Sequence, residues 1–258
     1  MKDLLLITPP FTQLNTPYPA TAYLKGFLNT KNISSYQIDL GIEVILEIFS
    51  KKGVTQIFNV KPENLSENTQ RIFALKEEYI KTIDEVIAFL QNKKPTLARQ
   101  ICSMNFLPEA SRFNQLDDME YAFGNMGLQD KAKHLATLYL EDLSDYIIEN
   151  IDENFGFSRY AERLGRSANS FDELYEKLQS DKTFVDNFTL EILDKKLLET
   201  KPKLVCFSVP FPGNLYSAFR CAQYIKNHYP KIKTAFGGGF ANTELRDLKD
   251  KRVFEFFD

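Results

Sequence analysis

Residues 204–242 carry the pattern that most restricts how this chain can fold. An apolar run over residues 204–209 is followed by an amphipathic stretch over residues 215–228, and a second short run over residues 233–236 leads into three consecutive glycines. Parallel strands need a crossover connection, usually a helix, and the two runs flank a stretch of helical periodicity. The segment therefore predicts a β-α-β unit.

The N-terminal residues show the same strand-helix-strand pattern. Residues 4–8 form a continuous apolar run, as in a strand covered on both faces, and the Pro-Pro pair at 9–10 prevents a helix directly after it. A helical pattern over residues 19–29 and a strand around residues 36–40 complete a second β-α-β unit. Together the two blocks predict an α/β fold with a doubly wound, mostly parallel, Rossmann-like (flavodoxin-like) sheet.

Between the two blocks the pattern becomes helical. Apolar residues at helical spacing predict one long helix over residues 72–90 and another around residues 135–147. Ser170 followed by Glu173 predicts a capping box that opens a third helical stretch. We therefore expect a large helical insertion in the α/β domain.

The C-terminal residues predict one more helix and one more strand of the same α/β pattern. A short helix is expected near residues 244–248, followed by a last strand that begins near Val253. The predicted organisation is an α/β domain in two segments, residues 1–44 and 201–258, with a helical insertion subdomain over residues 45–200.

The composition argues against two kinds of partner. With 32 basic and 35 acidic residues the formal net charge is -3, which gives no field to attract nucleic acid or an anionic membrane. The N-terminal apolar run is too short for a signal peptide or a membrane span. Cys102, Cys206 and Cys221 are far apart, which favours separate thiols in a reducing cytoplasm over a disulfide framework or a metal site.

Three of the predicted strands end in residues that suit a ligand site. In an open parallel sheet, ligands bind beyond the carboxyl ends of the strands, toward which helix N-termini point. Glycine lets a flat ligand approach the backbone, serine offers a hydroxyl, and proline and phenylalanine form an apolar floor. The candidate cofactor-binding residues are Thr8, Pro9, Pro10 and Phe11 after the first strand, Ser208, Val209, Pro210, Phe211 and Asn214 after the third, and Gly237, Gly238 and Gly239 after the fourth.

Each of these features also has a purely structural interpretation. A glycine run can be a tight turn, a Pro-Pro pair can simply end a strand, and Ser208 can be a buried hydroxyl bonded to a carbonyl. Their joint placement favours a binding site. The sequence has neither the Gly-x-Gly-x-x-Gly fingerprint at the first turn nor a Gly-Lys-Ser/Thr phosphate loop after a strand. No nucleophile with an adjacent base is visible, so no catalytic residue is assigned.

The motifs occur in a characteristic order. The Thr-Pro-Pro of residues 8–10 precedes the helical stretch YPATAYLKGFL, and the Ser-Val-Pro of residues 208–210 precedes the glycines at 237–238. In this order they resemble the cobalamin-binding domains found ahead of radical S-adenosylmethionine catalytic domains. Those domains carry Ser-x-Leu and Gly-Gly elements, and proline replaces the leucine here. The resemblance covers residues 1–44 and 203–258.

The resemblance implies a bound cobalamin at the strand ends. Its nucleotide tail would thread between Ser208 and the glycines at 237–239, and its corrin ring would lie over the strand ends against Phe11 or Phe211. A slot of this kind predicts that Gly238→Leu abolishes cofactor retention with little loss of thermal stability.

The cobalt ligand is expected to differ from that of other cobalamin proteins. In the cobalamin mutases and methionine synthases, a histidine after the first strand binds cobalt, and the corresponding loop has no histidine here. The two histidines, His134 and His228, fall in the helical insertion and at the end of a helix. The resemblance therefore implies base-off cobalamin without a protein histidine ligand, and no metal-ligating residue is assigned.

The same family places its catalytic chemistry in a second domain. The Cys-x3-Cys-x2-Cys loop that holds the 4Fe-4S cluster and cleaves S-adenosylmethionine is absent from this sequence. We therefore expect a radical S-adenosylmethionine domain in cis, downstream of Asp258, that performs methyl transfer or related radical chemistry. This chain alone would then bind cofactor without turnover.

Two other classes of function remain open from the sequence. The first is a flavodoxin-like binding or regulatory module for another flat cofactor, such as a flavin. The second is a non-catalytic interaction domain that keeps the sheet and binds no cofactor.

Overall fold

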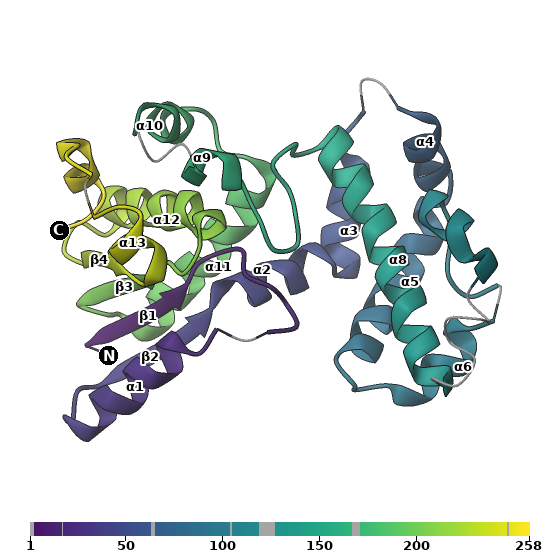
Figure 1. The fold of residues 1–258 in the computed structure, drawn as a ribbon, viewed down its shortest axis with the longest axis horizontal. Coiled ribbons are helices and arrows are strands. Elements are labelled where there is room, and N and C mark those ends of the chain that lie inside the picture. The colour runs from purple at the N-terminus through teal and green to yellow at the C-terminus, as the bar shows by residue number, and fades with distance from the viewer. Residues whose placement is uncertain are drawn as a thin grey trace. The chain divides into compact units, whose positions relative to one another are not determined.

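The chain forms two units in the computed structural model (Figure 1). The α/β unit contains Met1–Ile45 and Asn154–Asp258, and the helical unit contains Leu46–Glu153. The sequence boundary at residue 200 left residues 154–200 in the helical insertion, whereas the contacts of the structure group them with the sheet. The structure describes residues 3–16, 18–62, 65–103, 105–118, 127–166, 171–246 and 248–258.

A four-stranded parallel sheet is the centre of the α/β unit. Its strands are β1 (Leu4–Thr8), β2 (Ser35–Asp39), β3 (Leu204–Ser208) and β4 (Lys233–Gly237), in the spatial order β2-β1-β3-β4. Every neighbouring pair is parallel. The predicted α/β class with a parallel sheet is confirmed.

The connections wind in two directions from β1. The first crossover runs from β1 through α1 to β2, while the later ones run the opposite way, to β3 and then β4. Right-handed crossovers in opposite directions place α1 on one face of the sheet and α11 and α12 on the other. The helices of this unit are α1 (Ala20–Thr30), α2 (Leu40–Ile48, which continues into the helical unit), α9 (Glu162–Arg166), α10 (Asp172–Gln179), α11 (Phe184–Thr200), η3 (Pro212–Asn214), α12 (Leu215–His228), α13 (Gly239–Thr243) and η4 (Lys251–Glu255).

The two faces of the sheet differ in burial. On the α12 side, side chains such as Leu5, Ile7 and Val205 are fully buried. On the α1 side, β1 is covered, but Cys206 of β3 is only half-buried and Ala235 of β4 is exposed. We call this half of the sheet, formed by β3 and β4 on the α1 side, the open half-face. It borders the carboxyl ends of both strands.

The C-terminal residues depart from the expected helix and strand. The short helix α13 begins at Gly239, the third glycine, instead of near residue 244, and the predicted last strand is the 3-10 helix η4. This segment turns because Phe256 and Phe257 pack their rings against Phe219 of α12, with centroids 5.2 and 4.9 Å apart. Phe256 and Phe257 are therefore buried through ring contacts instead of through strand pairing.

The outer edge of β4 carries a charged cluster. The Asp258 amide donates to the Thr234 carbonyl, and the Thr234 amide donates to Asp258 Oδ2, both at 2.9 Å. Asp258 also forms ion pairs with Lys226 and Lys233 at 2.8 and 2.9 Å. Hydrogen bonding from the Lys226 side chain is the main reason that the pKa of Asp258 lies well below its usual value.

The helix boundaries in the structure bear on two of the predicted helices. Ser170, predicted to open a helix, lies outside the described residues. A complete capping box instead opens α11, where Thr183 and Asp186 each accept a hydrogen bond from the other's backbone amide. The predicted long helix over residues 72–90 is interrupted at Leu75, where one helix ends and the next begins.

The helical unit packs around a core of aromatic rings. Tyr146 of its longest helix contacts Phe58 and Phe73, with ring centroids 5.1 and 6.4 Å apart. None of the helices in the described part of the chain is long and apolar enough to cross a membrane. The described helices of this unit are α3 (Lys51–Asn59), α4 (Glu67–Ala74), α5 (Lys76–Leu90), η1 (Pro95–Leu97), α6 (Ala98–Ile101), η2 (Ser111–Asp118) and α8 (Gly127–Asn150).

A buried carboxylate fixes the start of η2 in this unit. Asp142 of α8 is fully buried and accepts hydrogen bonds from the backbone amides of Ala110 and Arg112 at 3.0 and 3.1 Å. Burial raises the pKa of Asp142 to about 6, against an ordinary value of 3.8, although the two amides oppose the shift. The folded protein therefore holds a proton on Asp142 more tightly than the unfolded chain does.

We expect Asp142→Asn to remove part of the pH dependence of stability. A carboxyl whose pKa is raised on folding stabilises the protein at low pH, and this contribution is lost as the pH rises through about 6. The loss of this contribution should lower the free energy of unfolding of the wild type by about 2 kcal/mol between pH 4.5 and pH 7. Urea denaturation of both proteins at the two pH values measures the difference, and equal pH dependence would contradict the assignment.

Candidate functional site

The sheet register brings three of the sequence-predicted residues into one row. Ile7 is paired with Phe207, so Thr8 and Ser208 stand side by side one position further on, and Ser208 is paired with Gly237. Side chains alternate between the faces of a sheet, which places all three positions on the α1 side. The row thus crosses the switch point between β1 and β3, where ligands bind in open parallel sheets.

The three consecutive glycines have three different environments. A Cβ atom on Gly237 would have no heavy atom within 4 Å, and one on Gly239 would meet only the Pro210 carbonyl oxygen at 3.5 Å. Gly238 has a φ of +112°, and its Cβ would lie 2.6 Å from the carbonyl oxygen of Val209. Space for a ligand is therefore open at Gly237 and closed at Gly238.

The strands β3 and β4 remain bonded beyond their ends. The Val209 amide donates to the Gly237 carbonyl at 2.7 Å, and the Phe240 amide donates to the Val209 carbonyl at 3.2 Å. These bonds close the expected slot at Gly238. The sequence had suggested that replacing Gly238 leaves thermal stability nearly unchanged, whereas this geometry requires a loss of stability. The accessible space lies on the open half-face, beside Gly237.

The two candidate phenylalanines play different parts. Phe11 is fully buried and packs edge to face on Phe155 and Tyr160, with centroids 6.1 and 5.7 Å apart. Its ring belongs to the core and offers no surface to a ligand. Phe211 is 53% exposed and touches the ring of Tyr18 at 6.0 Å. Of the two rings, Phe211 is the one available for stacking.

The loops after β1 and β3 are tied together by Asn214. Its side chain is fully buried, and its Nδ2 donates to the carbonyl of Pro9 at 2.7 Å, while the Phe11 amide donates to the carbonyl of Gly213 at 3.3 Å. Asn214 Oδ1 and the Thr8 hydroxyl are both buried without a hydrogen-bond partner. An unsatisfied buried polar group costs about 1–3 kcal/mol, so these atoms are suited to a ligand or water that pairs with them.

An open pocket of about 530 Å³ lies beside the ends of β3 and β4. Its volume is in the range of small-molecule sites, and its walls are mostly apolar. It is lined by Gly165, Pro210, Phe211, Pro212, Gly239, Phe240, Thr243 and Glu244. Three of these, Pro210, Phe211 and Gly239, were singled out from the sequence; Val209, Pro9 and Pro10 are buried behind the strand ends.

A segment that was left out of the predicted site residues packs directly on the loop after β3. A Cβ on Gly165 would lie 2.6 Å from the carbonyl oxygen of Pro212, and one on Gly213 would lie 3.2 Å from the Cα of Arg159. Such close backbone approach requires glycine on both sides. The glycines at 156 and 165 were the available signal, but glycine alone does not reveal which loop approaches it.

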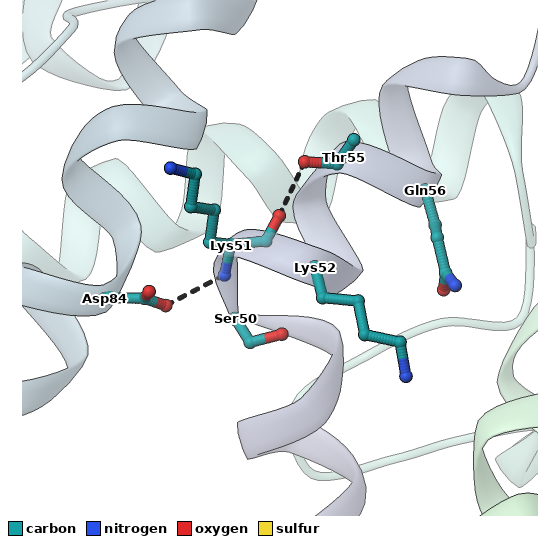
Figure 2. Close-up of a pocket in the computed structure, with 6 residues that line it drawn as sticks. All are labelled: Ser50, Lys51, Lys52, Thr55, Gln56 and Asp84. Carbon is teal, nitrogen blue, oxygen red and sulfur yellow. Dashed lines mark hydrogen bonds between the residues drawn. The ribbon is translucent and has the colours of Figure 1, made fainter.

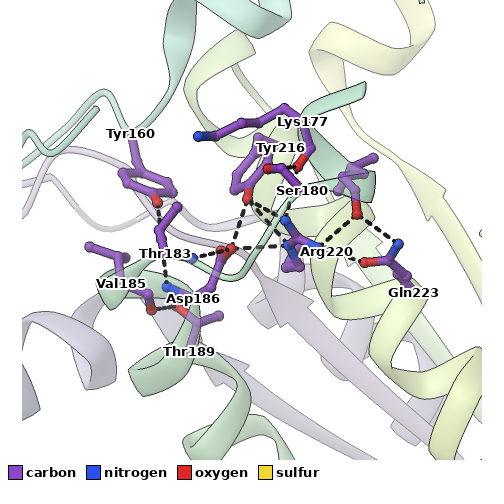
Figure 3. Close-up of polar contacts among 11 residues, drawn as sticks. Tyr160, Lys177, Ser180, Thr183, Val185, Asp186, Thr189, Tyr216, Arg220 and Gln223 are labelled. Carbon is purple, nitrogen blue, oxygen red and sulfur yellow. Dashed lines mark hydrogen bonds and ion pairs between the residues drawn. The ribbon is translucent and has the colours of Figure 1, made fainter. Parts of the chain in front are cut away.

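A buried ion pair anchors α12, the helix that starts at the site (Figure 3). Arg220 Nε lies 3.0 Å from Asp186 Oδ2, which also accepts from the Tyr216 hydroxyl at 2.7 Å. The guanidinium donates to the carbonyls of Leu178 and Lys177 at the end of α10. Burial is the main cause that raises the pKa of Tyr216, with the charge of Asp186 second. The network therefore joins α10, α11 and α12.

A second pocket, of about 560 Å³, lies in the helical unit at the start of α3 (Figure 2). Its two cations, Lys51 and Lys52, suggest an anion site at a helix N-terminus. However, Asp84 accepts the Lys51 amide at 2.8 Å, and Lys52 forms an ion pair with Glu47 at 2.9 Å. A carboxylate therefore already occupies the first amide of α3, and another already pairs with one of the two cations. It is lined by Ser50, Lys51, Lys52, Thr55, Gln56 and Asp84.

No metal site is formed by the residues that the structure describes. Among them, no three histidine, cysteine, aspartate or glutamate side chains gather so as to hold a metal ion. His134 lies in α8 of the helical unit, and His228 lies in the last turn of α12, away from the carboxyl edge of the sheet. Cys206 is half-buried on the open half-face, and burial raises the pKa of its thiol.

Comparison of the chain with protein-family models, curated proteins and solved structures gives no significant match.

Proposed function

We propose that the α/β unit binds a cobalamin at the carboxyl edge of its sheet, and that the sheet is a variant of the flavodoxin-like fold. The observation that carries the proposal is the row formed by Thr8, Ser208 and Gly237. This row combines two hydroxyl-bearing residues with a position at which no heavy atom lies within 4 Å of an added Cβ. The unpaired buried atoms at Thr8 and Asn214 fit the polar tail of such a cofactor.

The residues of the site have separable roles in this proposal. Gly237 leaves room for the tail, and Ser208 offers it a hydroxyl group. Phe211 provides an exposed ring beside the 530 Å³ pocket on which the corrin can pack. A bound cobalamin would supply a cobalt-carbon bond for methyl transfer or radical chemistry. Because the edge carries no histidine, we propose the base-off form.

The remainder of the proposal rests on the sequence resemblance alone. It comprises a radical S-adenosylmethionine domain in cis, with its 4Fe-4S cluster and S-adenosylmethionine, and a parent enzyme that performs methyl transfer or related radical chemistry. A cytoplasmic location belongs to the same proposal and is supported by the three free cysteines.

Mixing the purified chain with hydroxocobalamin, desalting it and recording the visible spectrum tests the proposal. We expect the corrin bands to stay with the protein in about one equivalent, because the site presents polar and apolar contacts together. A parallel sample receives a flavin mononucleotide. Retention of the flavin alone would support a flavin module, and a protein left colourless by both cofactors would contradict cobalamin binding.

A non-catalytic interaction domain is the second candidate. It is favoured by α1, whose Tyr23 and Phe27 side chains are 77% and 58% exposed, with Leu24 also exposed. Exposed apolar side chains gathered on one helix are typical of protein docking surfaces. The colourless outcome of the cofactor experiment would make this candidate the better explanation of the α/β unit.

A further inference from the structure

The hydroxyl of Thr8 is one of the buried polar groups at the carboxyl edge that have no hydrogen-bond partner. Thr8 is 1% exposed, and its Oγ1 has no hydrogen-bond partner. Leaving such a group unpaired costs about 1–3 kcal/mol. Valine has nearly the same shape and would fill the same space without this cost, so the fold itself gives no reason for threonine.

The position of Thr8 points to a role in binding. It stands at the last position of β1, at the switch point of the sheet, and beside Ser208 of β3. Its side chain belongs to the same row as Gly237, where the space on the open half-face begins. A ligand group that enters this space next to Ser208 reaches the Thr8 hydroxyl as the next polar atom along the row.

We propose that Thr8 is a specificity-determining contact that donates its hydroxyl proton to the ribonucleotide tail of the cobalamin. The inference rests on the proposed function and deepens it, because it assigns the choice between tailed and tailless corrinoids to one hydroxyl group. Phosphate and ribose oxygens are acceptors that satisfy a hydroxyl donor. The site should therefore prefer a corrinoid that carries the tail over cobinamide, the corrinoid that lacks it.

The test compares Thr8→Val with the wild-type chain in titrations with hydroxocobalamin and with aquocobinamide, followed by visible absorption. We expect Thr8→Val to weaken cobalamin binding about five- to tenfold, the effect of one lost hydrogen bond, and to leave cobinamide binding unchanged. The midpoint of thermal unfolding without ligand should stay the same or rise, because an unpaired buried group is removed.

Thr189→Val is the matched control. Thr189 is equally buried but lies on α11, and its hydroxyl donates to the Val185 carbonyl at 2.9 Å. Its replacement should lower the unfolding midpoint and leave the affinity for both corrinoids unchanged. Thr8→Ser keeps a hydroxyl and should keep the preference for the tailed corrinoid, which provides a second test if the valine variant does not fold.

The outcomes separate this inference from the proposed function. A wild-type chain that binds neither corrinoid overturns both. Binding of cobalamin by Thr8→Val with wild-type affinity overturns the role of Thr8 and leaves the proposed function standing. Equal weakening of cobalamin and cobinamide binding also overturns it, because the hydroxyl would then not recognise the tail.

Discussion

Gly238→Ala is expected to destabilise the protein by roughly 3 kcal/mol, the cost of a strained backbone combined with a close contact. The backbone of Gly238 has a φ of +112° and a ψ of 179°, a region that residues with a Cβ rarely adopt. An added Cβ would also lie 2.6 Å from the Val209 carbonyl oxygen, which cannot move away without breaking its bond to the Phe240 amide. Urea denaturation measures the loss.

Its neighbour Gly237 provides the matched comparison. A Cβ there would meet nothing within 4 Å, so Gly237→Leu should change the free energy of unfolding by less than about 1 kcal/mol. The same leucine would fill the space next to Ser208 and should prevent retention of cobalamin. Equal stability losses at the two glycines would contradict the geometry described for the strand ends, and undiminished cobalamin retention in Gly237→Leu would contradict the site.

Arg220→Met should lower the free energy of unfolding by about 3–5 kcal/mol. It leaves the buried Asp186 carboxylate without its cation and leaves the carbonyls of Leu178 and Lys177 without their donor. Because the network joins α10, α11 and α12, we expect the loss to appear as a shift of the main unfolding transition. Denaturant titration followed by circular dichroism measures this shift.

An exposed ion pair on the same helix as Asp186 provides the control for the buried one. Lys195 and Glu191 are in contact at 2.8 Å, but both side chains are more than half exposed. Lys195→Met should cost less than about 1 kcal/mol, since exposed pairs contribute little. If the two variants lose similar stability, the Arg220 network does not anchor α12 as described.

The strands β1 and β3 were predictable because each is a largely apolar run, and β4 was predictable because it follows the helix of the same β-α-β unit. Residues 4–8 match β1 without error, and the runs that begin at Leu204 and Lys233 match β3 and β4 to within one residue at their ends. The segment near Val253 is also rich in apolar residues, yet it forms η4. Its conformation depends on the position of Phe219, a long-range contact that local periodicity does not encode.

The boundary between the two units was harder to predict, because a helical sequence pattern does not show which element the apolar face of the helix packs against. Residues 154–200 are mostly helical, and they were grouped with the insertion. Yet α11 leads directly into β3 and is part of the crossover from β2, which keeps it with the sheet. The direct connection to a strand was the signal that could have moved the boundary.

The location of the candidate site could be predicted from the sequence, but the environment of each residue in it could not. The strand ends could be placed side by side from the β-α-β pattern, and the register brings Ser208 next to Gly237. The sequence cannot distinguish three identical glycines, whereas their φ angles and neighbours make Gly237 open and Gly238 closed. It also cannot show that the Thr8 hydroxyl is unpaired, which depends on every side chain around it.

The charged cluster on β4 bears on how this protein behaves at high concentration. An exposed outer strand presents unpaired backbone groups to which a strand of another molecule can add, the first step of aggregation. Here Asp258 occupies both outward-facing backbone groups of Thr234, and two lysines hold it in place. Since the pKa of Asp258 is lowered, its carboxylate stays ionised in mild acid, and this protection against intermolecular strand addition should persist there.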